Sequence, residues 1–153
     1  MPGPASGREQ TFSILTGGQL ASAVLHLPAG GGPHPAVLCL HGLAGVKSFY
    51  IVLARRLAEA GVACLRLDFR GCGDSAGSLE DLTLETQTED AAMAFKALRG
   101  RPDIRYDGIG LLGFSMHFPW HYEIEVRSLD GKTTFPRREP PAWSHPAIIG
   151  SGE

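Results

Sequence analysis

A serine near residue 115 has neighbours that favour nucleophilic chemistry. Ser115 lies in the run Gly113-Phe114-Ser115-Met116-His117, directly after the apolar stretch 108–113. A serine on a tight turn between a strand and a helix presents its hydroxyl above the sheet, where a histidine can remove its proton. Such a turn strains the backbone and requires small residues two positions to either side of the serine. Gly113 meets this requirement and His117 does not, so the run is a near match to the G-x-S-x-G pattern.

Two segments upstream of this serine favour the same chemistry. The segment His41-Gly42-Leu43-Ala44-Gly45 follows an apolar run at 36–40, and a loop in that position can point a backbone N–H at an oxyanion. The next apolar run leads into Leu67-Asp68-Phe69-Arg70-Gly71-Cys72-Gly73-Asp74-Ser75-Ala76-Gly77. These segments predict an oxyanion-binding loop and a glycine-rich loop at the ends of two successive strands.

Taken together and in this order, the three segments resemble the α/β-hydrolase fold family. The run 68–90 is most similar to its cinnamoyl (feruloyl) esterase and serine-aminopeptidase-like branch, and the resemblance covers about residues 10–116. It gives Ser115 the role of nucleophile and gives the backbone N–H groups of Leu43 and Met116 the role of oxyanion-hole donors. It implies hydrolysis of a small-molecule carboxylic ester through an acyl-serine intermediate, with no cofactor and no metal ion.

The elements needed to position these residues follow from local patterns. We expect a hairpin over 12–27 that turns at Gly17-Gly18, and buried strands at 36–40, 62–68 and 108–113. Helices are expected at 49–60 and after a capping box at 86–89. Their expected cap and inward-facing residues are Ser48, Leu53 and Leu57 in the first helix, and Ala92, Phe95 and Leu98 in the second. Alternation of strands and helices predicts an α/β fold with right-handed βαβ units and a parallel sheet.

The character of the chain changes after Ser115. Residues 116–153 hold five of the eleven prolines and both tryptophans, but only three of the twenty glycines. Alternation at 122–127 predicts a strand, the Asp130-Gly131 pair predicts a turn, and 133–135 is the expected return strand. We therefore expect residues 1–116 to form the N-terminal part of an α/β-hydrolase domain, and 117–153 to form an atypical tail that is irregular or contains a hairpin.

The sequence leaves two hypotheses about the function of the chain open. A βαβ unit takes roughly 30 residues or more, so the tail has no room for the later strands that carry the family's acid and histidine. Under the first hypothesis the chain is a serine hydrolase, and under the second it is a catalytically incomplete, truncated fragment without activity. Asp130 and His145 follow Ser115 in the order of a triad, but they lie in a turn and a proline-rich segment that give them no scaffold. His41 is expected to be a structural loop histidine rather than a base.

Other motifs are weaker than this resemblance. The segment 42–48 is similar to a phosphate-binding loop, but Val46 stands where that motif has glycine. The glycines at 71–77 are spaced one residue too far apart for a dinucleotide-binding fingerprint. His117 and His121 are four residues apart, but Pro119 between them spoils the shared helical face of a metal site.

Composition narrows the class of protein. The chain has 153 residues, of which 43% are apolar and 20% are charged, and a net charge of −2, which gives no long-range attraction for nucleic acid or a membrane surface. Residues 1–10 do not have the pattern of a signal peptide. An odd count of three cysteines favours a cytoplasmic location, with Cys39 and Cys64 in the core and Cys72 as a loop thiol.

An open edge beside the strand 108–113 is expected to cause self-association or poor solubility unless the tail covers it.

Overall fold

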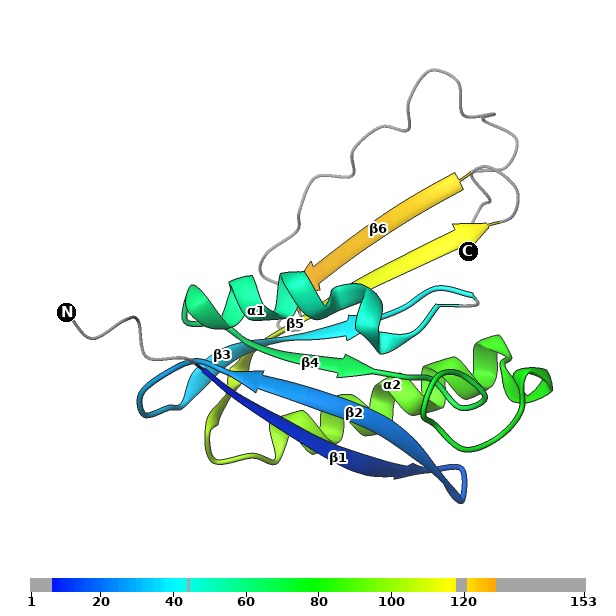
Figure 1. Cartoon of the computed structure of the whole chain (residues 1–153), viewed down its shortest axis with the longest axis horizontal. Helices are drawn as coiled ribbons and strands as arrows, with labels where there is room; N and C mark the ends of the chain where they lie inside the picture. Colours follow the sequence, from blue (N-terminus) through cyan, green and yellow to red (C-terminus); the bar gives the residue numbers. More distant parts are fainter. Residues whose placement is uncertain (1–6, 44, 118–120, 129–153) are drawn as a thin grey trace.

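The computed structural model describes residues 7–43, 45–117 and 121–128, with side chains described as far as residue 113. Six strands form one sheet in the order β1-β2-β4-β3-β5-β6 (Figure 1). Their bounds are Arg8–Thr16, Gln19–Leu27, His34–Leu40, Ala63–Leu67, Ile104–His117 and His121–Ser128 for β1 to β6. Strands β4, β3 and β5 run parallel to one another, while β1, β2 and β6 are joined by antiparallel pairing. The expected α/β architecture, with an N-terminal hairpin followed by parallel βαβ units, is confirmed.

The N-terminal hairpin turns where the sequence predicts it. Thr16 and Gln19 are the last paired residues, and the two residues between them are Gly17 and Gly18. Their φ angles are 53° and 76°, a region that favours glycine because it has no Cβ. The hairpin places β2 against β4 and so joins the antiparallel strands to the parallel part of the sheet.

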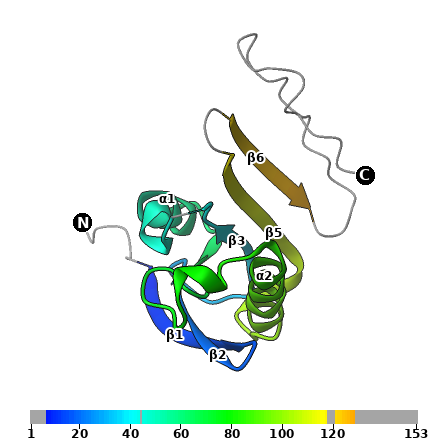
Figure 2. The same ribbon diagram turned by 90° about the vertical axis from the view of Figure 1, so that its right-hand side faces the viewer.

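Two helices cover opposite faces of the sheet (Figures 1 and 2). Helix α1 (Ile51–Glu59) lies over Cys39 of β3 and Cys64 of β4, together with Tyr50 and Ala54. Helix α2 (Leu84–Arg99) packs Ala94 and Leu98 against the larger cluster that includes Leu25, Leu38 and Leu65. Neighbouring positions of β3 therefore serve opposite layers, as expected of a strand buried on both faces.

The details of α1 differ from the sequence prediction. A 3₁₀ turn, η1 (Lys47–Tyr50), precedes the helix, and Ser48 lies inside this turn instead of capping α1. The buried stripe consists of Tyr50, Ala54 and Ala58, while Leu53 is exposed and Leu57 is half-buried. The alanines bring the helix close to β4, and the Tyr50 hydroxyl donates to the Leu40 carbonyl at 2.8 Å. This bond fixes the rotation of the helix.

Helix α2 begins earlier than its predicted capping box. Thr83 is the N-cap, and its hydroxyl accepts a hydrogen bond from the Thr86 N–H. On the inner face, Leu98 is buried as predicted and Phe95 is half-buried, whereas Ala92 is exposed. The buried positions that the prediction lacked are Ala94 and Asp90, and Asp90 binds partners on other elements.

The largest difference lies at the end of β5. The strand was expected to end at Gly113, but it continues through Ser115 to His117 and pairs with β6 in antiparallel register. The predicted strand at 122–127 is present as part of β6. Figures 1 and 2 show β6 and the far end of β5 projecting beyond the layer formed by the helices. The expected turn at 130–131 and return strand at 133–135 lie outside the described residues, and the division of the chain at residue 116 stays a prediction.

Within the residues described, no helix combines the length and the apolar character needed to cross a bilayer.

Candidate active site at the carboxyl edge of the sheet

The register of β3 and β5 brings two predicted functional segments to one edge of the sheet. Leu40, the last residue of β3, pairs with Gly113 of the parallel strand β5. Leu43 lies three residues beyond the first of these partners, and Ser115 lies two residues beyond the second. Carboxyl ends of neighbouring parallel strands are where open α/β sheets bind ligands. The fold therefore gives the predicted oxyanion loop and the predicted nucleophile a common edge.

The loop that carries Leu43 is a tight turn held from below by His41. The Gly45 N–H donates to the Gly42 carbonyl at 3.0 Å, and the Leu43 side chain is 57% exposed. The His41 ring is 3% exposed; its Nδ1–H donates to the Gly42 carbonyl at 2.8 Å, and its Nε2 accepts from the Phe69 N–H at 3.1 Å. Both ring nitrogens are thus occupied by backbone groups. The structural role predicted for His41 fits these contacts, because a ring used in this way has no free nitrogen for a proton transfer.

Burial keeps this histidine neutral. Removal of the ring from water lowers the pKa of His41 below its ordinary value, and the Gly42 carbonyl and the Asp68 carboxylate do not outweigh that effect. A neutral ring with a protonated Nδ1 is the form that both hydrogen bonds require. The electrostatics and the geometry of His41 therefore agree.

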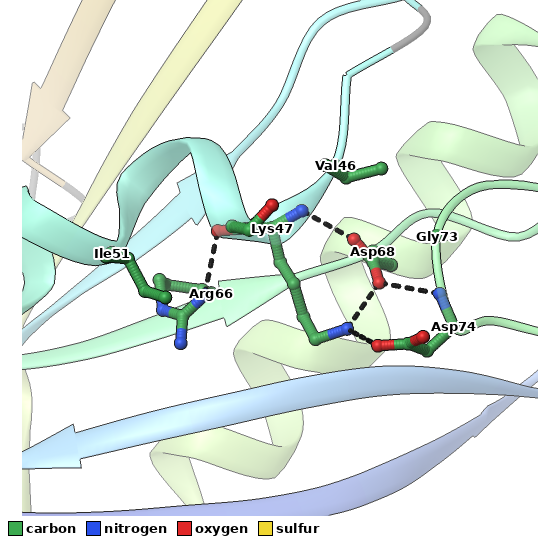
Figure 3. Close-up of a pocket in the computed structure, with 8 residues that line it drawn as sticks. Val46, Lys47, Ile51, Arg66, Asp68, Gly73 and Asp74 are labelled. Atoms are coloured by element: carbon green, nitrogen blue, oxygen red, sulfur yellow. Dashed lines mark hydrogen bonds and ion pairs between the residues drawn. The ribbon is translucent and has the colours of Figure 1, made fainter.

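The far end of the same loop is fixed by Asp68, the first residue after β4. Its Oδ1 accepts a hydrogen bond from the Lys47 N–H, and its Oδ2 accepts from the Asp74 N–H at 2.9 Å (Figure 3). The Lys47 ammonium binds both Asp68 Oδ2 and Asp74 Oδ2 at 2.5 Å. Burial opposes the charge on Lys47, but hydrogen bonds to the two aspartates outweigh burial and raise the pKa of Lys47 above its ordinary value. The same contact lowers the pKa of Asp74.

A second buried ion pair holds the glycine-rich loop to helix α2. Asp90 accepts from the Arg70 Nε at 2.6 Å, from the Arg70 backbone N–H at 2.8 Å and from the Thr16 hydroxyl at 2.8 Å. Glu89 is a further partner of the Arg70 guanidinium. These contacts connect the loop after β4 to α2 directly and, through Asp90, to β1, so two other elements set the loop's position.

A small hollow lies beside the Asp68 ion pairs. Its volume is about 330 Å³, and its walls include Val46, Ser48, Ile51 and Arg66 as well as Lys47 and Asp68. Arg66 is buried, and its Nε donates to His26 Nε2 while its Nη1 donates to the Lys47 carbonyl. Burial lowers the pKa of Arg66. Among the charged groups that line the hollow, Lys47 pairs with Asp68 and Asp74, whereas Arg66 binds a histidine nitrogen and a backbone carbonyl.

Ser115 and Met116 lie within β5, opposite Glu123 and Tyr122 of β6. In the described residues the chain passes through Ser115 as an extended strand, which is not the strand-to-helix turn that the sequence predicts for a nucleophile. The physical reason is that the alternating residues of β6 supply a pairing partner where the family pattern has a helix. Asp130 and His145 lie outside the described residues.

Sequence reasoning missed several residues that position this edge. Asp68 and Asp90 were included in the run that carries the resemblance, without a role, and Lys47 entered only as part of a rejected phosphate-loop pattern. The sequence did contain a signal for Asp68 and Asp90, because one directly follows a buried strand and the other lies within an amphipathic helix. An aspartate that is buried at such a position is seldom without a hydrogen-bond or ion-pair partner. Cys72, expected to be a loop thiol, is buried, and burial raises its pKa.

Metal-ligating side chains are dispersed in the part of the chain that the structure describes. No group of three or more histidine, cysteine, aspartate or glutamate residues is placed there to hold a metal ion.

Comparison with known proteins defines the class to which this fold and edge belong. The model of the alpha/beta hydrolase fold family matches residues 35–116, and the chain is a member of that family. The chain is 34% identical over 116 residues to esterase FrsA of Citrobacter koseri, and 32% identical to esterase FrsA of Salmonella paratyphi B. Each match covers 72% of this chain and 26% of the relative, so the chain spans about a quarter of the length of these curated relatives.

Solved structures agree with this assignment. Est1E from Butyrivibrio proteoclasticus, solved with ferulic acid bound, has a TM-score of 0.61 and 28% identity, over 67% of this chain and 41% of that protein. The structure of DcsB in complex with its substrate analogue has a TM-score of 0.62 and 27% identity, over 71% of this chain and 37% of that protein. The predicted resemblance to the α/β-hydrolase family is confirmed.

Proposed function

We propose that this chain carries the nucleophile and the oxyanion-hole donors of a carboxylic ester hydrolase. The observation that carries the proposal is the pairing of Leu40 with Gly113, which brings the Leu43 loop and the Ser115 segment to one edge of the sheet. Relatives named esterases, and a structural neighbour solved with ferulic acid bound, support an ester substrate. Both ring nitrogens of His41 are bonded to backbone groups, which supports a passive role for that residue and leaves the base to another group.

The proposed reaction is acyl transfer to Ser115 followed by hydrolysis. The Ser115 Oγ attacks the ester carbonyl carbon and gives up its proton to a base, and the backbone N–H groups of Leu43 and Met116 stabilise the tetrahedral oxyanion. The C–O bond to the alcohol breaks, the alcohol leaves with a proton, and water then attacks the acyl-serine and releases the carboxylic acid. The acid and histidine of the triad are unassigned in this chain.

One structural condition follows from this mechanism. A nucleophile elbow requires the chain to leave the sheet after Phe114, whereas Ser115, Met116 and His117 pair with β6. Activity therefore requires these last pairs to be open. The pairing favours the second candidate function, a catalytically incomplete fragment that lacks the triad acid and histidine and has no enzymatic activity.

A labelled fluorophosphonate and a p-nitrophenyl ester separate the two candidates, because only an activated serine reacts quickly with either. Ser115→Ala is the test variant, and Ser13→Ala, on an exposed position of β1, is the matched control. If the first candidate holds, Ser115→Ala abolishes labelling and hydrolysis, and Ser13→Ala leaves both unchanged. Loss of the histidine costs about a millionfold in turnover in a serine protease, so a chain without a base should hydrolyse esters close to background. Labelling that is equal in the wild type and Ser115→Ala would remove the first candidate.

We also propose a reducing, cytoplasmic location. Its support is that all three cysteines are free, including Cys39 and Cys64, whose sulfur atoms lie 3.4 Å apart as a thiol contact.

A further inference from the structure

The loop that carries Leu43 is attached at both ends to two consecutive residues after β4. At its start, His41 Nε2 accepts a hydrogen bond from the Phe69 N–H. At its end, the Lys47 N–H and the Lys47 ammonium bind the Asp68 carboxylate. Five residues, 42–46, lie between these attachments. Because the span is short, the two attachments restrict the positions open to Leu43.

The Asp68 carboxylate is suited to this role because each oxygen is used and the group is 1% exposed. Oδ1 binds the Lys47 N–H, while Oδ2 binds the Lys47 ammonium and the Asp74 N–H. All three partners are donors, so only an acceptor on both oxygens satisfies them. A Cβ at position 73 would lie 2.2 Å from Asp68 Oδ2 and would clash with it, so glycine at this position lets the carboxylate occupy its site.

Asp68 is itself held to the centre of the sheet. Its N–H donates to the Ser22 carbonyl at 2.9 Å, and its own carbonyl accepts from the Ser75 hydroxyl at 2.7 Å. The Ser75 Oγ in turn accepts from the Ser22 N–H at 2.8 Å. These bonds connect the loop, through Asp68, to β2, a strand that is paired on both sides.

We propose that Asp68 is a positioning residue that acts through Lys47 to fix the Leu43 N–H as an oxyanion donor. The proposal rests on the proposed function for the role of Leu43, while the mechanical claim concerns the loop alone. An oxyanion donor is effective only when it is held in place before the charge develops, because reorganisation during the reaction would consume the stabilisation. Asp68 does not need to touch the substrate to supply this order.

The test measures the hydrogen exchange of the Gly45 amide, which bonds within the loop and does not touch Asp68. In Asp68→Asn, an amide nitrogen replaces one acceptor, and in either orientation of the amide it faces at least one of the three donors. We expect the protection of the Gly45 amide to fall at least about tenfold, while the amide of Leu25 in β2 keeps its protection. Unchanged protection of Gly45 in a folded Asp68→Asn variant would overturn the proposal.

Three further variants, one at Asp74 and two at Lys47, complete the test. Asp74→Asn makes the same chemical change at an 81% exposed carboxylate whose partner among the described residues is the Lys47 ammonium, and it should change the Gly45 protection less than about twofold. Lys47→Met removes the ammonium and should lower the Gly45 protection, while Lys47→Arg retains the charge and should restore most of it. If Asp68→Asn fails to fold, the Lys47 pair decides the matter, and equal protection in Lys47→Met and the wild type would overturn the proposal.

Fluorophosphonate labelling separates this inference from the proposed function. If the wild type is labelled at Ser115, Asp68→Asn should lower the labelling rate at saturating reagent about tenfold, with little change in the half-saturating concentration. If the wild type is not labelled, the proposed function fails for this chain, and the exchange result still decides whether Asp68 orders the loop. Equal labelling rates in Asp68→Asn and the wild type would overturn the assignment of Asp68 to the oxyanion donor.

Discussion

At the scale of the residue, two buried histidines tie stability to pH. Burial lowers the pKa of His26, with a further contribution from Arg66, and burial lowers the pKa of His41. Each ring accepts a hydrogen bond at Nε2, from the Arg66 Nε in one case and from the Phe69 N–H in the other. Protonation of either ring would abolish its acceptor and bury a positive charge.

We expect the free energy of unfolding to fall as the pH drops below about 6.5, the ordinary pKa of histidine in the unfolded chain. The folded pKa values are lower, so the unfolded state binds protons first, and the stability contributed by the neutral rings is present above that pH and lost below it. The limiting slope is about 1.4 kcal/mol per pH unit for each histidine. Urea unfolding at pH 7.5, 6.5 and 5.5 measures the effect, and a stability that is flat over this range would contradict it.

Single-residue features could be predicted from the sequence where the constraint on the residue is local. The glycine pair at 17–18 predicts its turn because the constraint is local, and two positive φ angles are all that it requires. Asp68 and Asp90 could not be given roles, because their partners lie between 6 and 74 residues away along the chain. Long-range polar pairing has no period and no spacing from which it can be predicted.

At the scale of the element, helix α2 carries one leucine in the core and one on the surface. Leu98 is fully buried in the cluster that joins α2 to the sheet, whereas Leu84 in the first turn of the same helix is 77% exposed. The two residues thus offer the same side chain in opposite surroundings on one element.

We expect Leu98→Ala to lower the free energy of unfolding by about 2–5 kcal/mol, through lost burial and the cavity left behind. Leu84→Ala should change it by less than about 0.5 kcal/mol. Equilibrium urea unfolding of both variants measures the difference. Similar losses for the two variants would mean that α2 does not pack as described.

Helix α1 illustrates why the facing of an element was predicted less well than its existence. Periodicity predicts a helix near residues 49–60, but the sequence cannot tell whether leucine or alanine faces the sheet. The close approach to β4 and the bond from the Tyr50 hydroxyl to the Leu40 carbonyl select the alanine stripe. Leu53 is then directed outward although it is the larger apolar residue.

At the scale of the whole molecule, the sheet ends in two strands, β1 on one side and β6 on the other. β6 covers the edge of β5, so the expected tail strand does pair near that edge. In the described part of the chain, β6 itself is paired on one side only. Unpaired backbone groups along a strand are a template for a further strand.

We expect the chain to self-associate through this edge, with a sedimentation coefficient that rises with concentration in the micromolar range. Ile124 lies opposite Phe114 in the register of β5 and β6, and a charge there should weaken association, since edge charges oppose strand pairing. Ser13→Lys, on the exposed side of β1 at the other end of the sheet, is the control. If Ser13→Lys makes the chain monomeric and Ile124→Lys does not, the chain associates through β1 and not through β6. A monodisperse monomer at all concentrations would contradict self-association itself.

The sequence by itself determined the family, the hairpin, the alternation of strands and helices, and the order of the Leu43 loop and Ser115 along the chain. These features depend on local periodicity and on short motifs, which a single segment carries complete. Only the tertiary structure decided that β5 runs on through Ser115 to pair with β6, and that Asp68 holds the Leu43 loop. Strand pairing and buried ion pairs join residues that are distant in the chain, and their free energy exists only once folding has brought both partners together and removed water from between them.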